Sequence, residues 1–125
     1  MRRILVLFAS AFLFNTVQAQ DDADEYEIVL PVEAQKCVLP ASPDTLPKEA
    51  NYDQLKTAKS QIAVFQGEVL IFRECLQAAE SNPENTAGNK QAIISSFNYS
   101  VEMEERIAER FNEAIRNYKE RQANQ

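Results

Sequence analysis

The sequence predicts an all-α protein: an antiparallel two-helix hairpin, similar to a coiled coil, with an extended proline-rich N-terminal arm that a disulfide clamps to it. Three observations lead to this prediction. Two long segments repeat apolar residues at heptad spacing, the segment before them holds three prolines, and the chain has two cysteines, Cys37 and Cys75. The 125 residues, 45% of them apolar, suffice for a single domain.

Residues 1–19 have the pattern of a secretory signal peptide. Two arginines precede an apolar run at 4–14, and Val17 and Ala19 fit the −3 and −1 positions of a cleavage site. A membrane anchor is the alternative, but a spanning helix needs about 20 apolar residues. We therefore expect cleavage after Ala19, a periplasmic or secreted protein, and no membrane anchor once the signal is removed.

Residues 20–50 are predicted to form an acidic leader followed by an extended arm. Residues 26–33 alternate apolar and polar side chains as a strand does, but Pro31 restricts such a strand to a sheet edge, and no second strand is evident. We interpret this stretch as an extended segment that lies on the helices, or as a partly disordered one. The three prolines that follow favour a conformation close to polyproline II: Pro40, Pro43 and Pro47.

Residues 51–125 are predicted to form the hairpin, with helices at about 51–81 and 89–121. Apolar residues of the first helix step by three and four and so define a seam: Leu55, Ala58, Ile62, Phe65, Val69, Phe72, Leu76 and Ala79. The same stepping recurs in the second helix, where one polar residue interrupts it: Ile94, Phe97, Val101, Glu104, Ala108, Phe111, Ile115 and Tyr118.

The two seams fit each other in an antiparallel register. Residues that face each other across such a hairpin have a nearly constant sum of residue numbers. The seam pairs give 169 or 170, from Leu76 with Ile94 near the loop to Leu55 with Ile115 at the open end. Small residues face large ones along the seam, as interdigitating side chains require.

The two cysteines are expected to form a disulfide, because an even count in an exported chain favours pairing. Cys75 lies about 25 residues into the first helix, or about 37 Å along its axis. The chain from Cys37 to the start of that helix reaches at most about 43–47 Å when it is extended. An intramolecular bond therefore requires the arm to run nearly straight along the hairpin, and pairing between two chains is the alternative. Closing this loop stabilises the fold by roughly 4 kcal/mol.

The first helix carries more apolar surface than its seam uses. Four apolar residues lie outside the seam positions: Val64, Leu70, Ile71 and Ala78. Three apolar residues of the arm could cover this face: Val38, Leu39 and Leu46. A partner protein or a second copy of the chain could cover it instead, so the four residues form a candidate interaction face.

The composition excludes several classes of function. The chain has no histidine, which excludes histidine-activated nucleophiles and histidine-ligated zinc. Its two glycines, Gly67 and Gly88, cannot form a phosphate-binding loop. A net charge of −6 without a basic stripe is unlike a nucleic-acid-binding protein. We therefore predict no enzyme activity, no cofactor and no nucleic-acid partner.

Four carboxylates of the second helix are the remaining candidates for a chemical site. Glu104 falls at a seam position, where it is a proton donor if buried, or else a residue that sets the register or extends to solvent. Glu102, Glu105 and Glu109 lie near one helix face and could hold a divalent cation, although a solvated face is the ordinary interpretation. We predict no metal site.

Three short motifs follow the proline-rich arm: FRECL at 72–76, RFN at 110–112 and RNYK at 116–119. Together with the signal peptide, the two cysteines and the arm, they resemble the pattern of a group of small uncharacterised exported proteins of proteobacteria. The resemblance spans most of the mature chain. It implies a location in the bacterial cell envelope and no particular activity.

The sequence thus favours a non-catalytic exported protein that acts in the cell envelope through protein–protein interaction or self-association. A periplasmic chaperone-like binder of unfolded clients is the first alternative, since it too needs an exposed apolar face. The second alternative is a small metal-binding or hydrolytic protein that uses four carboxylates: Glu102, Glu104, Glu105 and Glu109.

Overall fold

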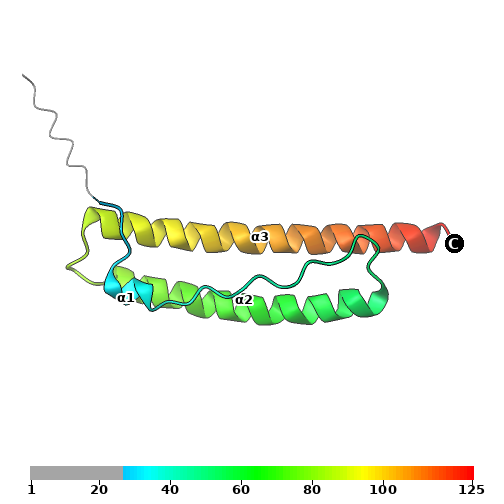
Figure 1. The fold of residues 1–125 in the computed structure, drawn as a ribbon, viewed down its shortest axis with the longest axis horizontal. Helices are drawn as coiled ribbons and strands as arrows, with labels where there is room; N and C mark the ends of the chain where they lie inside the picture. Colours follow the sequence, from blue (N-terminus) through cyan, green and yellow to red (C-terminus); the bar gives the residue numbers. More distant parts are fainter. Residues whose placement is uncertain (1–26) are drawn as a thin grey trace, which may run out of the picture.

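The computed structural model describes residues 27–125, which form three helices (Figure 1): α1 (Val32–Gln35), α2 (Tyr52–Glu80) and α3 (Ala87–Ala123). The two long helices, α2 and α3, run antiparallel and pack side by side, and the described residues contain no strand. The all-α hairpin that the heptad spacing predicted is therefore confirmed. The predicted signal peptide at 1–19, and the acidic leader up to residue 26, lie outside the described residues.

Both long helices begin with a reciprocal pair of hydrogen bonds at their N-terminus. The side chain of Asn51 accepts from the backbone N–H of Gln54, whose side chain accepts from the N–H of Asn51. Thr86 and Asn89 form the same pair at α3. These bonds satisfy N–H groups that lack a partner within the helix. At α3 they start the helix at Ala87, ahead of the predicted position.

The arm, residues 27–50, contains a short helical turn that the sequence pattern did not predict. Residues 26–33 were expected to be extended, but α1 begins at Val32. Pro31 has a φ of −65°, which suits a helix start, and its carbonyl accepts hydrogen bonds from the N–H groups of Ala34 and Gln35 at 2.9 and 3.1 Å. The turn carries Ala34 into the core, where it is buried. Burial of this small residue explains why the alternating pattern was misleading.

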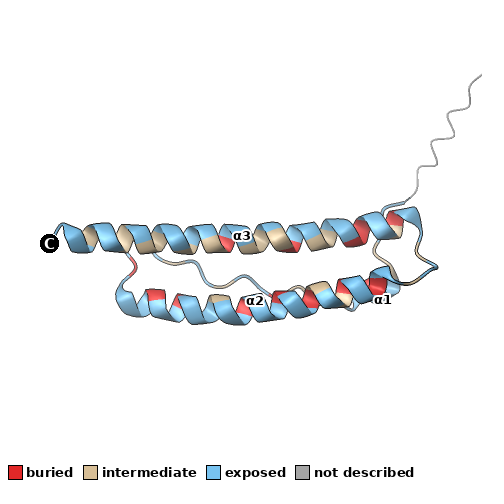
Figure 2. Ribbon diagram, turned by 180° about the vertical axis from the view of Figure 1, so that it is seen from behind, coloured by how far each residue is buried: buried red, intermediate tan, exposed pale blue. Residues whose placement is uncertain are grey.

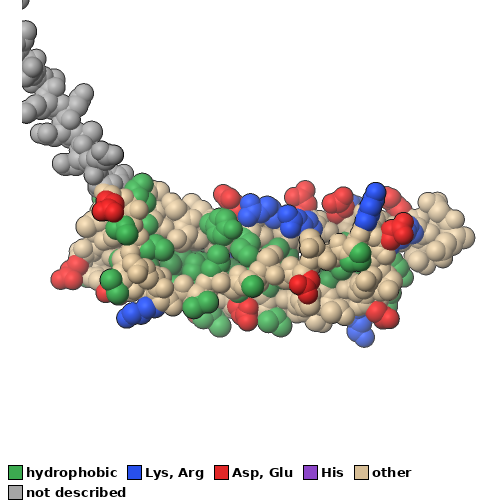
Figure 3. All heavy atoms as spheres, in the orientation of Figure 1, with side chains coloured by type: hydrophobic (Ala, Val, Ile, Leu, Met, Phe, Trp, Pro, Cys, Tyr) green, Lys and Arg blue, Asp and Glu red, His purple; other side chains and the backbone are tan. Residues whose placement is uncertain are grey.

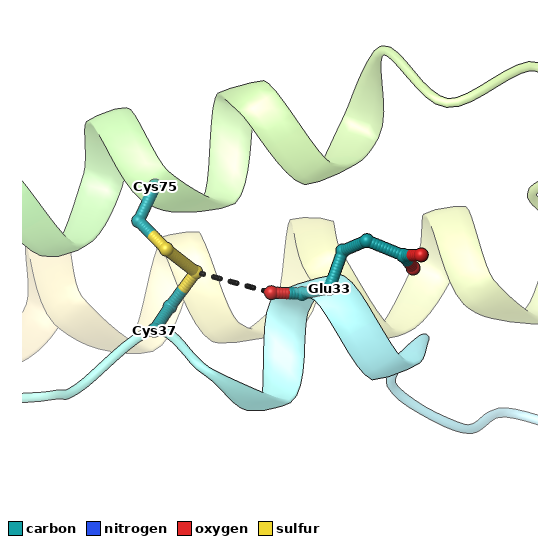
Figure 4. The surroundings of a disulfide bond; sticks show 3 residues. All are labelled: Glu33, Cys37 and Cys75. Carbon is teal, nitrogen blue, oxygen red and sulfur yellow. Dashed lines mark hydrogen bonds between the residues drawn. A yellow bond between two sulfur atoms is a disulfide. The ribbon is translucent and has the colours of Figure 1, made fainter.

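The rest of the arm runs back along the hairpin (Figure 1), in a groove between the two long helices where residues 42–46 line a hollow with Ala58 of α2 and Ile107 of α3. Both of its ends are fastened. Cys37, just after α1, is bonded to Cys75 of α2, with their Cα atoms 5.6 Å apart (Figure 4). At the open end of the hairpin, Arg121 of α3 donates a hydrogen bond of 2.6 Å to the carbonyl of Ala50. The intramolecular disulfide that the reach argument required is therefore present.

The disulfide lies beside α1. The sulfur of Cys37 is 3.9 Å from the carbonyl oxygen of Glu33, one turn earlier (Figure 4). This is a van der Waals contact, because a bonded sulfur carries no hydrogen to donate. The helical turn α1 and the disulfide together hold residues 32–37 of the arm against the C-terminal part of α2.

The core divides into two clusters along the hairpin (Figure 2). The cluster nearest the loop is formed by Ala34, Phe72, Leu76, Ala79 and Ile93, and Leu30, Cys37 and Leu39 of the arm pack against it. The cluster in the middle is formed by Phe65, Val69 and Ile107, and Ile62 and Met103 pack against it. The arm therefore contributes to the core as a third element, chiefly at the disulfide end.

The buried face of α3 is rotated from the predicted seam. Ile94 was expected to face α2 but is 45% exposed, whereas its neighbour Ile93 is buried, and Ser100 and Ile107 follow at seven-residue intervals. The prediction considered two helices alone. Because the arm packs on one side of the groove, the face of α3 that is covered lies closer to the arm. Of the predicted seam positions, Ile94 is exposed, and Val101, Ala108 and Ile115 are half-buried.

Candidate interaction surfaces

The outward side of α2 presents an apolar surface to solvent. Val64, Leu70 and Ile71 are 62%, 56% and 66% exposed, and Ala78 is also exposed. Positions 64, 71 and 78 are about 115–155° around the helix from the mean direction of the buried residues of α2, because each residue advances the helix by about 100°. We call these four residues the α2 stripe; they are the candidate face that the sequence singled out.

The arm does not cover the α2 stripe, contrary to one of the two expectations. Val38 is itself 79% exposed, and Leu39 and Leu46 are half-buried. The bond to Cys75 and the packing of Leu39 against the core direct the arm into the groove between the helices. The arm borders only one edge of the stripe, where residues 41–44 line a hollow together with Val64. Within the described residues, the stripe therefore remains open to solvent.

The outward side of α3 has the opposite character. Most of its exposed residues are polar or charged, although Ile94 and Tyr99 are also exposed. The polar and charged ones include Gln91, Ser95, Asn98, Glu102, Glu105 and Glu109. Figure 3 shows charged side chains gathered along the edge of the molecule that α3 forms, and hydrophobic side chains projecting among fewer charged ones from the edge that α2 forms. The heptad-spaced row of exposed apolar residues at 64, 71 and 78 belongs to α2.

A glycine lies within the α2 stripe. No heavy atom outside the local helix lies within 4 Å of the position that a Cβ of Gly67 would take. A glycine inside a helix costs roughly 1 kcal/mol relative to alanine. In the sequence, Gly67 served only to exclude a phosphate-binding loop. In the structure the absence of a side chain at Gly67 leaves open space on the helix surface between Val64 and Ile71.

Glu104 is a half-buried residue that bridges the two long helices. It accepts a hydrogen bond of 2.7 Å from the guanidinium of Arg73, which makes an ion pair, and one of 3.4 Å from Gln66. Arg73 also donates to the buried hydroxyl of Ser100 at 2.9 Å and lies 5.7 Å from the ring centre of Phe97. This arrangement fits a residue that sets the register of the hairpin. Sequence reasoning missed Arg73, since it flanks the seam instead of occupying it.

Replacing Arg73 and Glu104 by alanine, singly and together, is expected to give a coupling energy of about 1 kcal/mol. The side chains are 19% and 29% exposed, so solvent screens part of their attraction. Urea denaturation of the four proteins measures the coupling, and added salt should reduce it. Strict additivity of the two substitutions would contradict a role for this ion pair in holding the register.

The four carboxylates of α3 do not converge. Glu104 is directed to Arg73, while Glu102, Glu105 and Glu109 are exposed. Residues 27–125 contain no group of three or more acidic or thiol side chains placed to hold a metal ion. The geometry thus offers the metal-binding alternative no ligand set in this part of the chain.

A hollow of about 590 Å³ lies at the open end of the hairpin. Its apolar lining comes from Leu55, Phe111 and Ile115, with two tyrosines, and three lysines stand among its lining residues: Lys56, Lys59 and Lys119. The heptad pattern did not predict this hollow. The lysine spacing was a signal for it, because positions 56 and 59 lie one turn apart beside the end of the seam. Leu55, Phe111 and Ile115 are buried or half-buried, unlike the apolar residues of the α2 stripe, while Tyr52 at the edge of the hollow is 64% exposed.

Comparison with known proteins adds no relative: no family model matches the chain, and neither a curated protein nor a solved structure is significantly similar to it. No helix within residues 27–125 has both the length and the apolar character to cross a bilayer. The Cys37–Cys75 disulfide is compatible with an oxidising location outside the cytoplasm.

Proposed function

We propose that this chain is a non-catalytic exported protein of the cell envelope that acts through protein–protein interaction or self-association at the α2 stripe. The observation that carries the proposal is the exposure of Val64, Leu70 and Ile71 on a helix whose other face already packs against α3. Large apolar side chains gathered on one exposed face are typical of a binding surface. The polar outward side of α3 supplies the internal comparison.

The export part of the proposal rests on two independent features. The first 19 residues have the pattern of a signal peptide, and a disulfide fastens the arm to α2. Disulfides of this kind persist in the periplasm or outside the cell and are rare in the cytoplasm. A periplasmic or secreted location therefore agrees with both.

A chaperone-like role is the second candidate, and the same exposed stripe favours it. Holding unfolded clients requires an apolar surface that accepts many sequences, often through flexible side chains. The stripe is made mainly of β-branched and small residues on a regular helix, which suits one defined partner better. A test of aggregation separates the two: a chaperone suppresses the aggregation of unrelated unfolded proteins at stoichiometric amounts, and a specific binder does not.

Crosslinking in the native envelope tests the proposal directly. A photoreactive side chain at position 71 is expected to yield discrete crosslinked products, whereas the same group at the exposed position 98 of α3 should yield few. The substitution Leu70→Glu is expected to abolish the products from position 71, because a carboxylate opposes burial of the stripe. Equal products from positions 71 and 98, unaffected by Leu70→Glu, would refute binding at this face.

A further inference from the structure

The outward side of α2 carries a second heptad pattern in addition to the seam. Six exposed residues step by four and three along it: Ser60, Val64, Gly67, Ile71, Glu74 and Ala78. Two further exposed residues flank this line, Ala63 and Leu70. Such spacing is the requirement for packing against another helix of similar length. The partner must therefore present a matching helix, and α2 of a second copy satisfies this requirement in one orientation.

We propose that a second copy of this chain docks on the α2 stripe with its own α2 antiparallel, in a register centred between positions 64 and 67. This inference rests on the proposed function and specifies its partner. In this register Val64 of each copy lies over Gly67 of the other, Ile71 lies against Ser60, and Leu70 lies against Ala63. Every large side chain then meets a small one, as close packing of two helices requires.

The small residues at the contact are exposed in the monomer, where the one side-chain hydrogen bond among them is local, from the hydroxyl of Ser60 to the carbonyl of Lys56. The Cβ position of Gly67 is open, and both Ala63 and Ser60 are exposed. Glycine at the centre lets the two helix backbones approach more closely than side chains elsewhere allow. The contact thus has two identical halves related by a two-fold axis. In each half, Val64 of one copy fills the open space over Gly67 of the other.

The charges at the ends of the stripe select the antiparallel orientation. Lys56 precedes the stripe and Glu74 follows its apolar centre, and both are exposed. Neither has an ion-pair partner among residues 27–125, where the sole ion pair joins Arg73 to Glu104. The antiparallel register brings Lys56 of each copy beside Glu74 of the other. A parallel pair would instead set Glu74 against Glu74, and like charges in contact oppose association.

Sedimentation of the disulfide-bonded protein over a range of concentrations tests the proposal. We expect a reversible dimer in the micromolar range, since the contact is a single helix pair. Gly67→Lys should weaken it at least tenfold, because the new side chain occupies the place of Val64. Lysine favours a helix more than glycine does, so unfolding cannot account for this loss. Asn112→Lys, which adds the same charge on exposed α3, should leave the dimer unchanged.

A charge exchange tests the register. Lys56→Glu and Glu74→Lys should each weaken the dimer several-fold, because each sets like charges together at both ends. The double variant should recover the association. An equimolar mixture of the two single variants should also recover it as a heterodimer, since each end charge of one chain then lies beside an opposite charge of the other. Folding effects within one chain cannot produce recovery on mixing.

The outcomes separate this inference from the proposed function. A protein that stays monomeric at every concentration, or a dimer that tolerates Gly67→Lys, overturns the second-copy partner. If the stripe variants nevertheless remove crosslinks to another protein in the envelope, the proposed function stands with a different partner. Failure of recovery in the mixture overturns the antiparallel register.

Discussion

Replacing Cys37 and Cys75 by serine is expected to lower the free energy of unfolding by about 4 kcal/mol. The bond closes a loop of 38 residues, and in the chain-entropy account a loop of this length restricts the unfolded chain by that amount. Loss of the bond also frees the end of the arm that places Ala34 and Leu39 on the first core cluster. The effect is therefore large for a molecule whose two main helices share a narrow core.

Urea and thermal denaturation measure this loss, with an expected fall in melting temperature of roughly 20 °C. The unsubstituted protein in reductant is the matched control and should agree with the double serine variant. A change below about 1 kcal/mol would show that the arm is held mainly by packing and by Arg121 at its other end.

The hairpin and its disulfide could be predicted because each follows from a simple geometric requirement. Heptad spacing identifies two helices that must pack together, and Leu76 and Val69 are buried as that spacing requires. The reach of an extended chain then leaves one path by which Cys37 can meet Cys75. Neither argument depends on details of side-chain packing, which explains why both hold.

The rotation of α3 could not be predicted because it depends on a third element. The position of the arm in the groove determines which side of α3 is covered, and the sequence pattern of α3 alone does not include it. Ser100 contributed to the wrong prediction of the buried face, because a serine in a helix pattern is normally assigned to the surface. Its burial is explained only by the hydrogen bond that Arg73 donates to its hydroxyl. The helical turn at Val32–Gln35 was missed for a similar reason, because the burial of Ala34 is a tertiary effect.

The candidate site was predictable in its position but not in its detail. Val64 and Ile71 are surplus to the seam, and this surplus is visible in the sequence. That the arm leaves them exposed required the structure. The contribution of Gly67 also required it, because an open Cβ position is a property of the surroundings.

Two leucines of the same helix provide the sharpest comparison between core and surface. Leu76 is 1% exposed in the first core cluster, while Leu70 is 56% exposed on the α2 stripe. Leu76→Ala is expected to cost about 3 kcal/mol, since it removes buried surface and leaves a cavity. Leu70→Ala is expected to change stability by no more than about 0.5 kcal/mol. Urea denaturation at a protein concentration well below that of dimerisation measures both.

This pair of substitutions also decides whether the α2 stripe is available for binding. Folding does not require large apolar side chains at positions that the monomer leaves in water, and several of them gathered on one helix face are typical of a docking surface. If Leu70→Ala destabilised the monomer as much as Leu76→Ala, the stripe would belong to the core in solution. It could not then serve as a surface for a partner or for a second copy. A small effect of Leu70→Ala on stability, together with a large one on association, is the combination that a docking face requires.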